Sequence, residues 1–330
     1  MRLRAKRMWM KARKMNLNDV ITIDCLYQRP RHAASYLMIE DGEAVFVETN
    51  TVHAVPILLD MLKQNGISPE RVRHVIVTHI HFDHAGGTSV LLDHCPNADV
   101  ICHPRAQRHL VDPARLIESA KGVYGAAAFE RLYMPMHEIA ENRVRSVEDG
   151  AQMKFGSRTF SFLHTRGHAN HHMVIHDSKS GGIFTGDAFG VEYDEERRSE
   201  RPFLLCSSAP TDFDPDEALA SVDKMLALHP SRLYMTHYGE LANVEAAARA
   251  LKNSIMQLAE VAKAALERSL HGEELQAFCN AGVLRAAEEQ AAACGVILTQ
   301  EDRDAIAWYV GINAQGLALY AEKCRVGRSA

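Results

Sequence analysis

The stretch that decides the fold of this chain is His79-Ile80-His81-Phe82-Asp83-His84. It directly follows the apolar run at residues 74–78, and a short run rich in β-branched residues is typical of a buried strand. Gly86-Gly87 comes next, and residues 88–92 have the pattern of a helix start. Four side chains able to bind a metal therefore lie on one predicted turn between a strand and a helix. Imidazole nitrogens and a carboxylate crowded on such a turn suit a borderline cation such as zinc.

Three further candidate ligands occur downstream, and each lies just beyond a predicted strand. They are His168 after residues 159–163, Asp187 after residues 182–185, and His237 after residues 232–235. Because each follows the end of a strand, all seven side chains could converge on one edge of the sheets. A histidine-rich surface loop, the plainer interpretation of the first cluster, does not account for the other three.

These motifs, in this order, resemble those of the metallo-β-lactamase superfamily, and the resemblance covers roughly residues 21–240. It implies an α/β fold of the αββα sandwich type, followed by a helical appendage. It also implies a division of the ligands between two metal ions. One ion would be held by His79, His81 and His168, the other by Asp83, His84 and His237, with Asp187 bridging the two.

The chemistry implied by this resemblance is hydrolysis. A bound cation can lower the pKa of water to about 7, and two cations about 3.5–4 Å apart can share one hydroxide. We therefore expect a metal-dependent hydrolase with two divalent ions, zinc first and iron or manganese as alternatives, whose bridging hydroxide attacks an ester-like bond. The resemblance also implies that Asp83 orients this hydroxide and takes its proton. The alternative is that Asp83 serves only as a metal ligand. His172 is expected to hold a ligand or its loop in place from outside the metal.

The ligand set most resembles glyoxalase II and its relatives, in a prokaryotic branch. β-Lactam hydrolases usually lack an acidic ligand where this chain has Asp187, and flavin di-iron proteins have Glu in place of His81. A thioester or a lactone is therefore the expected substrate. Tyr193 lies where lactonases place a tyrosine against the substrate carbonyl, and an ordinary loop tyrosine is the alternative. Glyoxalase II binds glutathione with a basic cluster near its C-terminus. The basic residues here, Lys323, Arg325 and Arg328, are expected past the last helix, so the sequence does not predict specificity for glutathione thioesters.

Other functions remain open at this point. A mononuclear iron persulfide dioxygenase would use only the site built from His79, His168 and Asp187. The presence of Asp83, His84 and His237 favours two metals instead. A two-metal phosphodiesterase would use the same pair of cations. A regulatory protein could keep the fold without the chemistry.

The chain divides into three predicted parts. Residues 1–14 hold seven basic side chains and no acidic one, and we expect a disordered arm there. Residues 15–240 form the metallo-β-lactamase-type catalytic domain, in which a mostly helical insertion at residues 103–142 is a candidate substrate lid. Residues 241–330 predict helices that pack on this domain, and the last helix begins at Thr299 with Asp302 at capping-box spacing.

The composition narrows the class of protein further. The chain has 330 residues, of which 47% are apolar and 24% are charged, and this composition is typical of a globular enzyme. No run of eighteen apolar residues occurs, so no membrane span is expected. Seven scattered cysteines indicate reduced thiols and a cytoplasmic setting. Outside the basic arm the chain is acidic, which argues against nucleic acid as the main ligand. We expect a small-molecule substrate, and a homodimer is the assembly left open.

Overall fold

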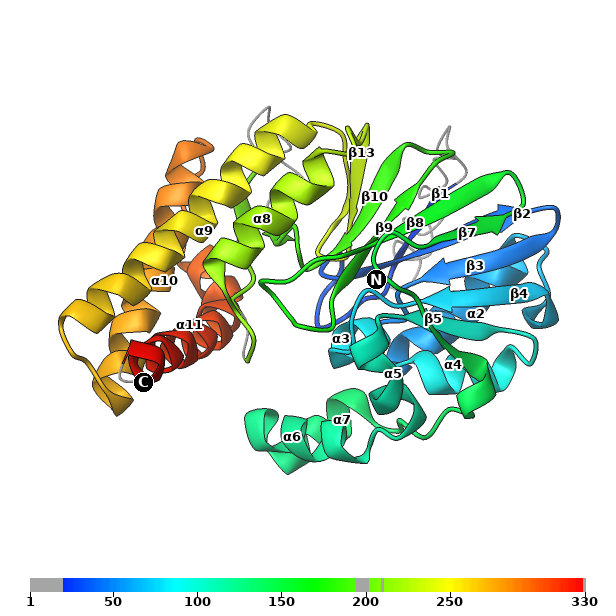
Figure 1. The fold of residues 1–330 in the computed structure, drawn as a ribbon, viewed down its shortest axis with the longest axis horizontal. Coiled ribbons are helices and arrows are strands. Elements are labelled where there is room, and N and C mark those ends of the chain that lie inside the picture. The colour runs from blue at the N-terminus through cyan, green and yellow to red at the C-terminus, as the bar shows by residue number, and fades with distance from the viewer. Residues whose placement is uncertain (1–19, 194–201, 209–210, 329–330) are drawn as a thin grey trace, which may run out of the picture.

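The computed structural model of this protein describes residues 20–193, 202–208 and 211–328 (Figure 1). The predicted basic arm at residues 1–14 lies outside them. Within the described residues, two six-stranded sheets pack face to face, helices cover their outer faces, and a group of helices ends the chain. The α/β sandwich expected from the sequence is thereby confirmed.

The first sheet is mixed, with an antiparallel and a parallel half. Its strands, in spatial order, are β1 (Val20–Asp24), β2 (Ala34–Glu40), β3 (Glu43–Val47), β4 (Val72–Ile76), β5 (Asp99–Cys102) and β6 (Val144–Ser146). Strands β3 to β6 run parallel to one another. The carboxyl ends of β3 and β4 therefore lie side by side, and the histidine cluster begins three residues after β4.

The second sheet is mostly antiparallel, and only β10 and β13 run parallel. Its strands, in spatial order, are β14 (Gly239–Leu241), β13 (Arg232–Met235), β10 (Gly182–Gly186), β9 (Met173–Asp177), β8 (Arg158–His164) and β7 (Gln152–Phe155). A separate two-stranded ribbon joins β11 (Val191–Glu192) to β12 (Leu204–Leu205). Aromatic side chains such as Tyr36, Phe162 and Phe184 fill the space between the two sheets.

Helices cover both outer faces of the sandwich. The helices α2 (Val55–Gln64) and α4 (Thr88–His94) cover the first sheet, and α8 (Pro215–Leu226) covers the second. The connections of the first sheet also contain four short helices: η1 (Val52–Ala54), η2 (Pro69–Arg71), α3 (Phe82–Ala85) and η3 (Glu141–Arg143). The start of α8 illustrates the local rules, because Asp214 Oδ1 accepts hydrogen bonds from the backbone N–H groups of Asp216 and Glu217, and Pro215 occupies the first turn.

The insertion between β5 and β6 is helical, as predicted. It contains α5 (Pro104–Val111), α6 (Ala114–Tyr124) and α7 (Ala126–Tyr133). Phe129 and Tyr133 of α7 pack on Phe82, with ring centroids 4.8 and 5.2 Å apart. Tyr133 also shares a hydrogen bond of 2.8 Å with the hydroxyl of Tyr27. The insertion is therefore fastened by an aromatic cluster to the loop that carries the histidine motif.

The C-terminal part is formed by α9 (Val244–Glu267), α10 (Gly272–Ala293) and α11 (Gln300–Arg328). One apolar cluster runs from the outer face of the second sheet into all three helices. At the start of α11, Thr299 and Asp302 form the predicted capping box, in which each side chain accepts the other's backbone N–H. The expectation for the basic tail was wrong, because Lys323 and Arg325 lie within α11 and Arg325 donates to the Leu270 carbonyl.

Two expectations from composition can be compared with the structure. None of the described helices is both long and apolar enough to cross a membrane. All seven cysteines lie in the described residues, and none of them forms a disulfide there.

A buried ion-pair network joins the two sheets. The guanidinium of Arg158, on β8, is fully buried and donates to the carboxylate of Glu40 at 2.8 Å and to that of Asp177. Lys179 Nζ lies 2.7 Å from the same carboxylate of Glu40. Because a buried charge without a partner costs several kcal/mol, these groups must stay together in the folded protein.

Arg158→Ala is expected to lower the free energy of unfolding by about 3–5 kcal/mol, because it leaves the buried carboxylate of Asp177 without its cationic partner. Arg145→Ala is the control, since this arginine forms an exposed ion pair with Asp99 and its loss should cost less than about 1 kcal/mol. Chemical denaturation of both variants measures the difference. Equal losses would contradict a structural role for the buried network.

Candidate metal centre

The seven predicted ligands all lie just beyond the ends of strands, as expected. His79 and His81 are in the loop after β4, and Asp83 and His84 are in α3, which follows that loop. The other three follow strands of the second sheet: His168 after β8, Asp187 after β10 and His237 after β13. The structure places these seven side chains in two adjoining groups.

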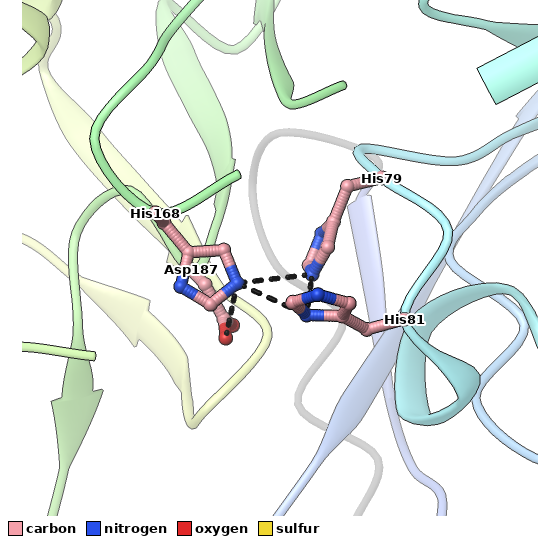
Figure 2. Close-up of side chains that lie close together, drawn as sticks. All are labelled: His79, His81, His168 and Asp187. Carbon is pink, nitrogen blue, oxygen red and sulfur yellow. Dashed lines mark hydrogen bonds and ion pairs between the residues drawn. The ribbon is translucent and has the colours of Figure 1, made fainter. Parts of the chain in front are cut away.

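The first group contains His79, His81, His168 and Asp187 (Figure 2). The two early histidines approach from one side, and His168 and Asp187 approach from the other. His79 Nε2 lies 2.8 Å from His81 Nδ1, and His168 Nε2 lies 3.3 and 3.1 Å from these two nitrogens. Nitrogens bound to one tetrahedral zinc at about 2.0–2.1 Å are themselves about 3.3 Å apart. The spacing therefore fits a single cation.

The protonation of these rings also fits a cation. His168 Nδ1 lies 3.2 Å from the carbonyl of Ser207, which can only accept, so Nδ1 carries the hydrogen and Nε2 offers a lone pair. Burial, reinforced by the neighbouring imidazoles, holds the pKa of His79 and the pKa of His81 well below the ordinary histidine value. Both rings are neutral, as metal ligands must be.

The second group contains Asp83, His84 and His237. His237 Nε2 lies 3.5 Å from Asp83 Oδ2, and His237 Nδ1 donates to the carbonyl of His32 at 2.8 Å. Burial alone would lower the pKa of His84 and of His237, but the adjacent carboxylates, Asp187 foremost, raise both pKa values above the ordinary one. This part of the centre therefore favours positive charge.

Asp187 faces both groups with its two carboxylate oxygens. Oδ1 lies 3.1 Å from His84 Nε2 and 3.5 Å from His237 Nε2, whereas Oδ2 lies 3.4 Å from His168 Nε2. His84 Nε2 and Asp187 Oδ1 are buried, and neither has a hydrogen-bond partner of suitable geometry among the described residues. A cation that both atoms can coordinate would satisfy these two buried atoms, which lack a hydrogen bond. The donor set thus fits two metal ions with Asp187 between them.

Glu48 is a residue of this centre that was not predicted. It is 1% exposed, its Oε1 accepts the backbone N–H of Thr78 at 3.1 Å, and its Oε2 lies 3.4 Å from His84 Nδ1. Glu48 directly follows β3, the parallel neighbour of β4, which places it beside the histidine loop. Neither Glu48 Oε2 nor His84 Nδ1 has a hydrogen bond of suitable geometry among the described residues, so the carboxylate faces this ring as a nearby negative charge. An acidic residue directly after an apolar strand was the available signal.

His172 supports the backbone of Asp187 instead of joining either group. Its Nε2 accepts the backbone N–H of Asp187 at 3.2 Å, and its Nδ1 donates to Thr165 Oγ1 at 2.8 Å. Gly186 makes this approach possible, because its φ is +48° and a Cβ there would lie 2.5 Å from His172 Nε2. A role for His172 in holding a ligand's loop agrees with this position and stays a prediction.

Asp83 and Tyr193 are the two residues predicted to act on the substrate. The carboxylate of Asp83 is 22% exposed, more than that of Asp187. Burial would raise the pKa of Asp83, but His84 and His237 hold it below its ordinary value, so Asp83 is a deprotonated carboxylate. Burial raises the pKa of Tyr193, which keeps its phenol protonated.

Tyr193 lies beside the centre and not within it. Its ring packs against those of Phe203 and Tyr309, and the guanidinium of Arg29 lies 5.8 Å from its centroid. One residue earlier, the backbone N–H of Glu192 donates to the carbonyl of His237 at 2.6 Å. Among the described residues, no histidine besides the predicted five belongs to either metal-ligand group.

Asp187→Ala is expected to lose at least one metal ion per chain, because the carboxylate that faces both groups is removed. Elemental analysis of protein purified without added metal measures this loss. Asp93→Ala removes an exposed acid that pairs with His137 and should leave the metal content unchanged. An Asp187→Ala protein that retains about two ions per chain would refute the bridging role.

The two groups are expected to release their metal ions at different pH values. Protons compete for His84 and His237, whose pKa values are raised, at a higher pH than for His79 and His81, whose pKa values are lowered. As the pH falls, the ion held by Asp83, His84 and His237 should therefore leave first.

Cobalt absorption and content, followed from about pH 8 to about pH 5, measure this order in the cobalt-loaded protein. His237→Ala should show only the release at lower pH, and His81→Ala only the release at higher pH. Loss of both ions from the parental protein in one step would mean that the two groups do not differ in this way.

Comparisons with known proteins agree with this geometry. The sequence model of the family described as the metallo-beta-lactamase superfamily matches residues 29–237. The metallo-beta-lactamase fold-containing protein ST1585 of Sulfurisphaera tokodaii is 24% identical over 214 residues, which are 61% of this chain and 77% of that protein. The crystal structure of ST1585 matches with a TM-score of 0.60 and 19% identity, over 91% of this chain and 98% of that one. At this identity, the structural likeness shows the fold.

Two relatives with enzymatic names match over shorter spans. An N-acyl homoserine lactonase of Bacillus sp is 27% identical over 171 residues, which are 51% of this chain and 55% of the lactonase. A hydroxyacylglutathione hydrolase of Legionella pneumophila is 23% identical over 116 residues, which are 35% of this chain and 33% of that hydrolase. The family match itself spans most of the chain and includes all seven candidate ligands, and so this protein belongs to the metallo-β-lactamase superfamily.

Proposed function

We propose that this protein is a dinuclear metal-dependent hydrolase of the glyoxalase II-like branch, and that it cleaves an ester-like bond in a small-molecule thioester or lactone. The observation that carries this proposal is the position of Asp187, whose two oxygens face two separate groups of imidazoles and carboxylates. A carboxylate in that position can bind two cations at once and lower their mutual repulsion.

The names of two relatives support a carbonyl substrate. One is a lactonase and the other a hydroxyacylglutathione hydrolase, although this chain matches only about half and a third of their lengths. Zinc is the metal that we propose, because imidazole and carboxylate ligands suit it. Iron and manganese bind similar sets of donors.

Two of the protein's own residues, Asp83 and Tyr193, have proposed roles in the reaction. Divalent cations, when bound, lower the pKa of water to about 7 and polarise a carbonyl oxygen. Asp83, as a carboxylate with part of its surface open, is positioned to accept a proton from the attacking water. Tyr193, as a protonated phenol, donates a hydrogen bond to the oxygen of the substrate carbonyl.

Turnover of a substrate panel tests the proposal. The metal-loaded protein is expected to hydrolyse at least one thioester or lactone faster than any phosphodiester, and a chelator should abolish this activity. Asp83→Asn should lower kcat by roughly 10²-fold or more if this carboxylate takes the proton. Hydrolysis of phosphodiesters alone would favour a phosphodiesterase, and no turnover by fully loaded protein would sink the hydrolase proposal.

A second variant tests the role of Tyr193. Tyr193→Phe should lower kcat/KM by roughly 10²-fold, because only the hydroxyl is removed. Tyr320→Phe is the matched control, since this tyrosine packs on Phe213, just before α8 begins, and its replacement should leave kcat/KM unchanged. Equal kcat/KM values for the two variants would show that Tyr193 is an ordinary loop tyrosine without a role in the reaction.

A further inference from the structure

Residues 202–208 form a short stretch that touches two of the candidate ligands, and we call it the support segment. It contains β12, which pairs with β11. At its end, the carbonyl of Ser207 accepts from His168 Nδ1 at 3.2 Å, and the hydroxyl of Ser207 donates to Asp187 Oδ2 at 3.3 Å. One residue of the segment therefore contacts both His168 and the carboxylate shared by the two groups.

The backbone of the support segment is held by polar side chains of the C-terminal helices. Ser254 of α9 accepts the N–H of Cys206 at 2.9 Å, and Gln290 of α10 donates to the carbonyl of Leu204 at 3.3 Å. From α11, Tyr309 donates to the carbonyl of Cys206, and Asn313 Oδ1 accepts the N–H of Ser208. All four side chains are buried within or beside the apolar cluster that joins these helices to the second sheet.

Asn313 uses both halves of its side-chain amide. Its Oδ1 accepts from the backbone N–H of Ser208 and lies 2.9 Å from the Ser208 hydroxyl, while its Nδ2 donates to the carbonyl of Tyr309 at 2.9 Å. Asn313 is 1% exposed and Ser208 is fully buried. A buried amide that is hydrogen-bonded on both sides has one orientation, so it fixes the place of Ser208 relative to α11.

We propose that Asn313 is a positioning residue of the metal centre, which acts through the support segment on His168 and Asp187. The orientation of the His168 ring depends on the Ser207 carbonyl, and Ser207 is adjacent to the residue that Asn313 holds. The Ser208 hydroxyl can still donate to the backbone carbonyl of residue 313, which lies 3.1 Å away. Without the Asn313 amide, however, the buried N–H of Ser208 loses its acceptor, and the segment must move to satisfy it. The first group of ligands then loses its preset geometry.

This inference rests on the metal centre that the proposed function requires, but not on any particular substrate. Loss of a group that orients a metal ligand typically weakens metal binding by about 10–100-fold. Metal affinity is therefore the quantity to measure, since it can be determined in a protein that hydrolyses nothing.

The experiment compares cobalt binding by the full-length parental protein, Asn313→Ala and Tyr309→Phe. Competition with a chromophoric chelator gives the cobalt Kd, and the visible cobalt spectrum reports the geometry of the ligands. Asn313→Ala should raise the Kd of one ion by about 10–100-fold and change its spectrum. Tyr309→Phe removes a single hydroxyl, keeps the ring in place, and should change both quantities in the same direction by less.

Leu317→Ala is the matched control for loss of stability. Leu317 is fully buried on the same helix, and its apolar side chain makes no hydrogen bond to the support segment. This variant should lower Tm at least as much as Asn313→Ala, yet its folded form should keep the parental cobalt Kd and spectrum.

The possible results separate the hypotheses. Parental Kd and spectrum in folded Asn313→Ala and Tyr309→Phe would overturn the positioning role. An equal rise in Kd for Leu317→Ala would also overturn it, because helix packing would then explain the effect. A parental protein that binds no cobalt refutes both the metal centre and this inference. Metal binding that depends on Asn313, without turnover of any ester, would refute the proposed function alone.

Discussion

The metal centre depends on carboxylates that are buried among imidazoles. Asp187 is only 8% exposed, and Glu48, which faces the other ring nitrogen of His84, is 1% exposed. Negative charge in such a place is costly unless positive charge lies beside it, and the raised pKa of His84 reflects this need in the absence of metal. Cations bound in place of those protons would satisfy the same carboxylates and leave the rings neutral. The field of Asp187 is thus the constraint around which the strands and loops of the centre are arranged.

The sandwich meets this constraint by ending four strands at one place. The loop after β4 supplies ligands from the first sheet, and the loops after β8, β10 and β13 supply them from the second. Close approach of these loops is permitted at Gly186, where a side chain would collide with His172 and Thr78. Strand pairing and packing therefore set the positions of the candidate ligands.

Features encoded in neighbouring residues could be predicted, and features made by distant contacts could not. Each candidate ligand or ligand cluster follows an apolar run, which is a local signal, and the α/β class follows from the alternation of strands and helices. The sandwich arrangement was implied by the family resemblance. Glu48 meets Thr78 only because β3 and β4 are parallel neighbours, and Ser208 meets Asn313 across 105 residues. No periodicity marks such pairs. The length of α11 was underestimated for the same reason. Its last turns include Arg325, which donates to the carbonyl of Leu270, 55 residues earlier in the chain.

The aromatic fastening of the insertion has a consequence for altering this protein. Phe82 stands between His81 and Asp83 in the sequence, and its ring packs on Phe129 and Tyr133 of α7. Remodelling α7 to admit a different molecule would disturb the same backbone that carries the donor atoms. Any redesign of this insertion therefore has to preserve the packing around Phe82, because the backbone on either side of it carries two of the candidate ligands.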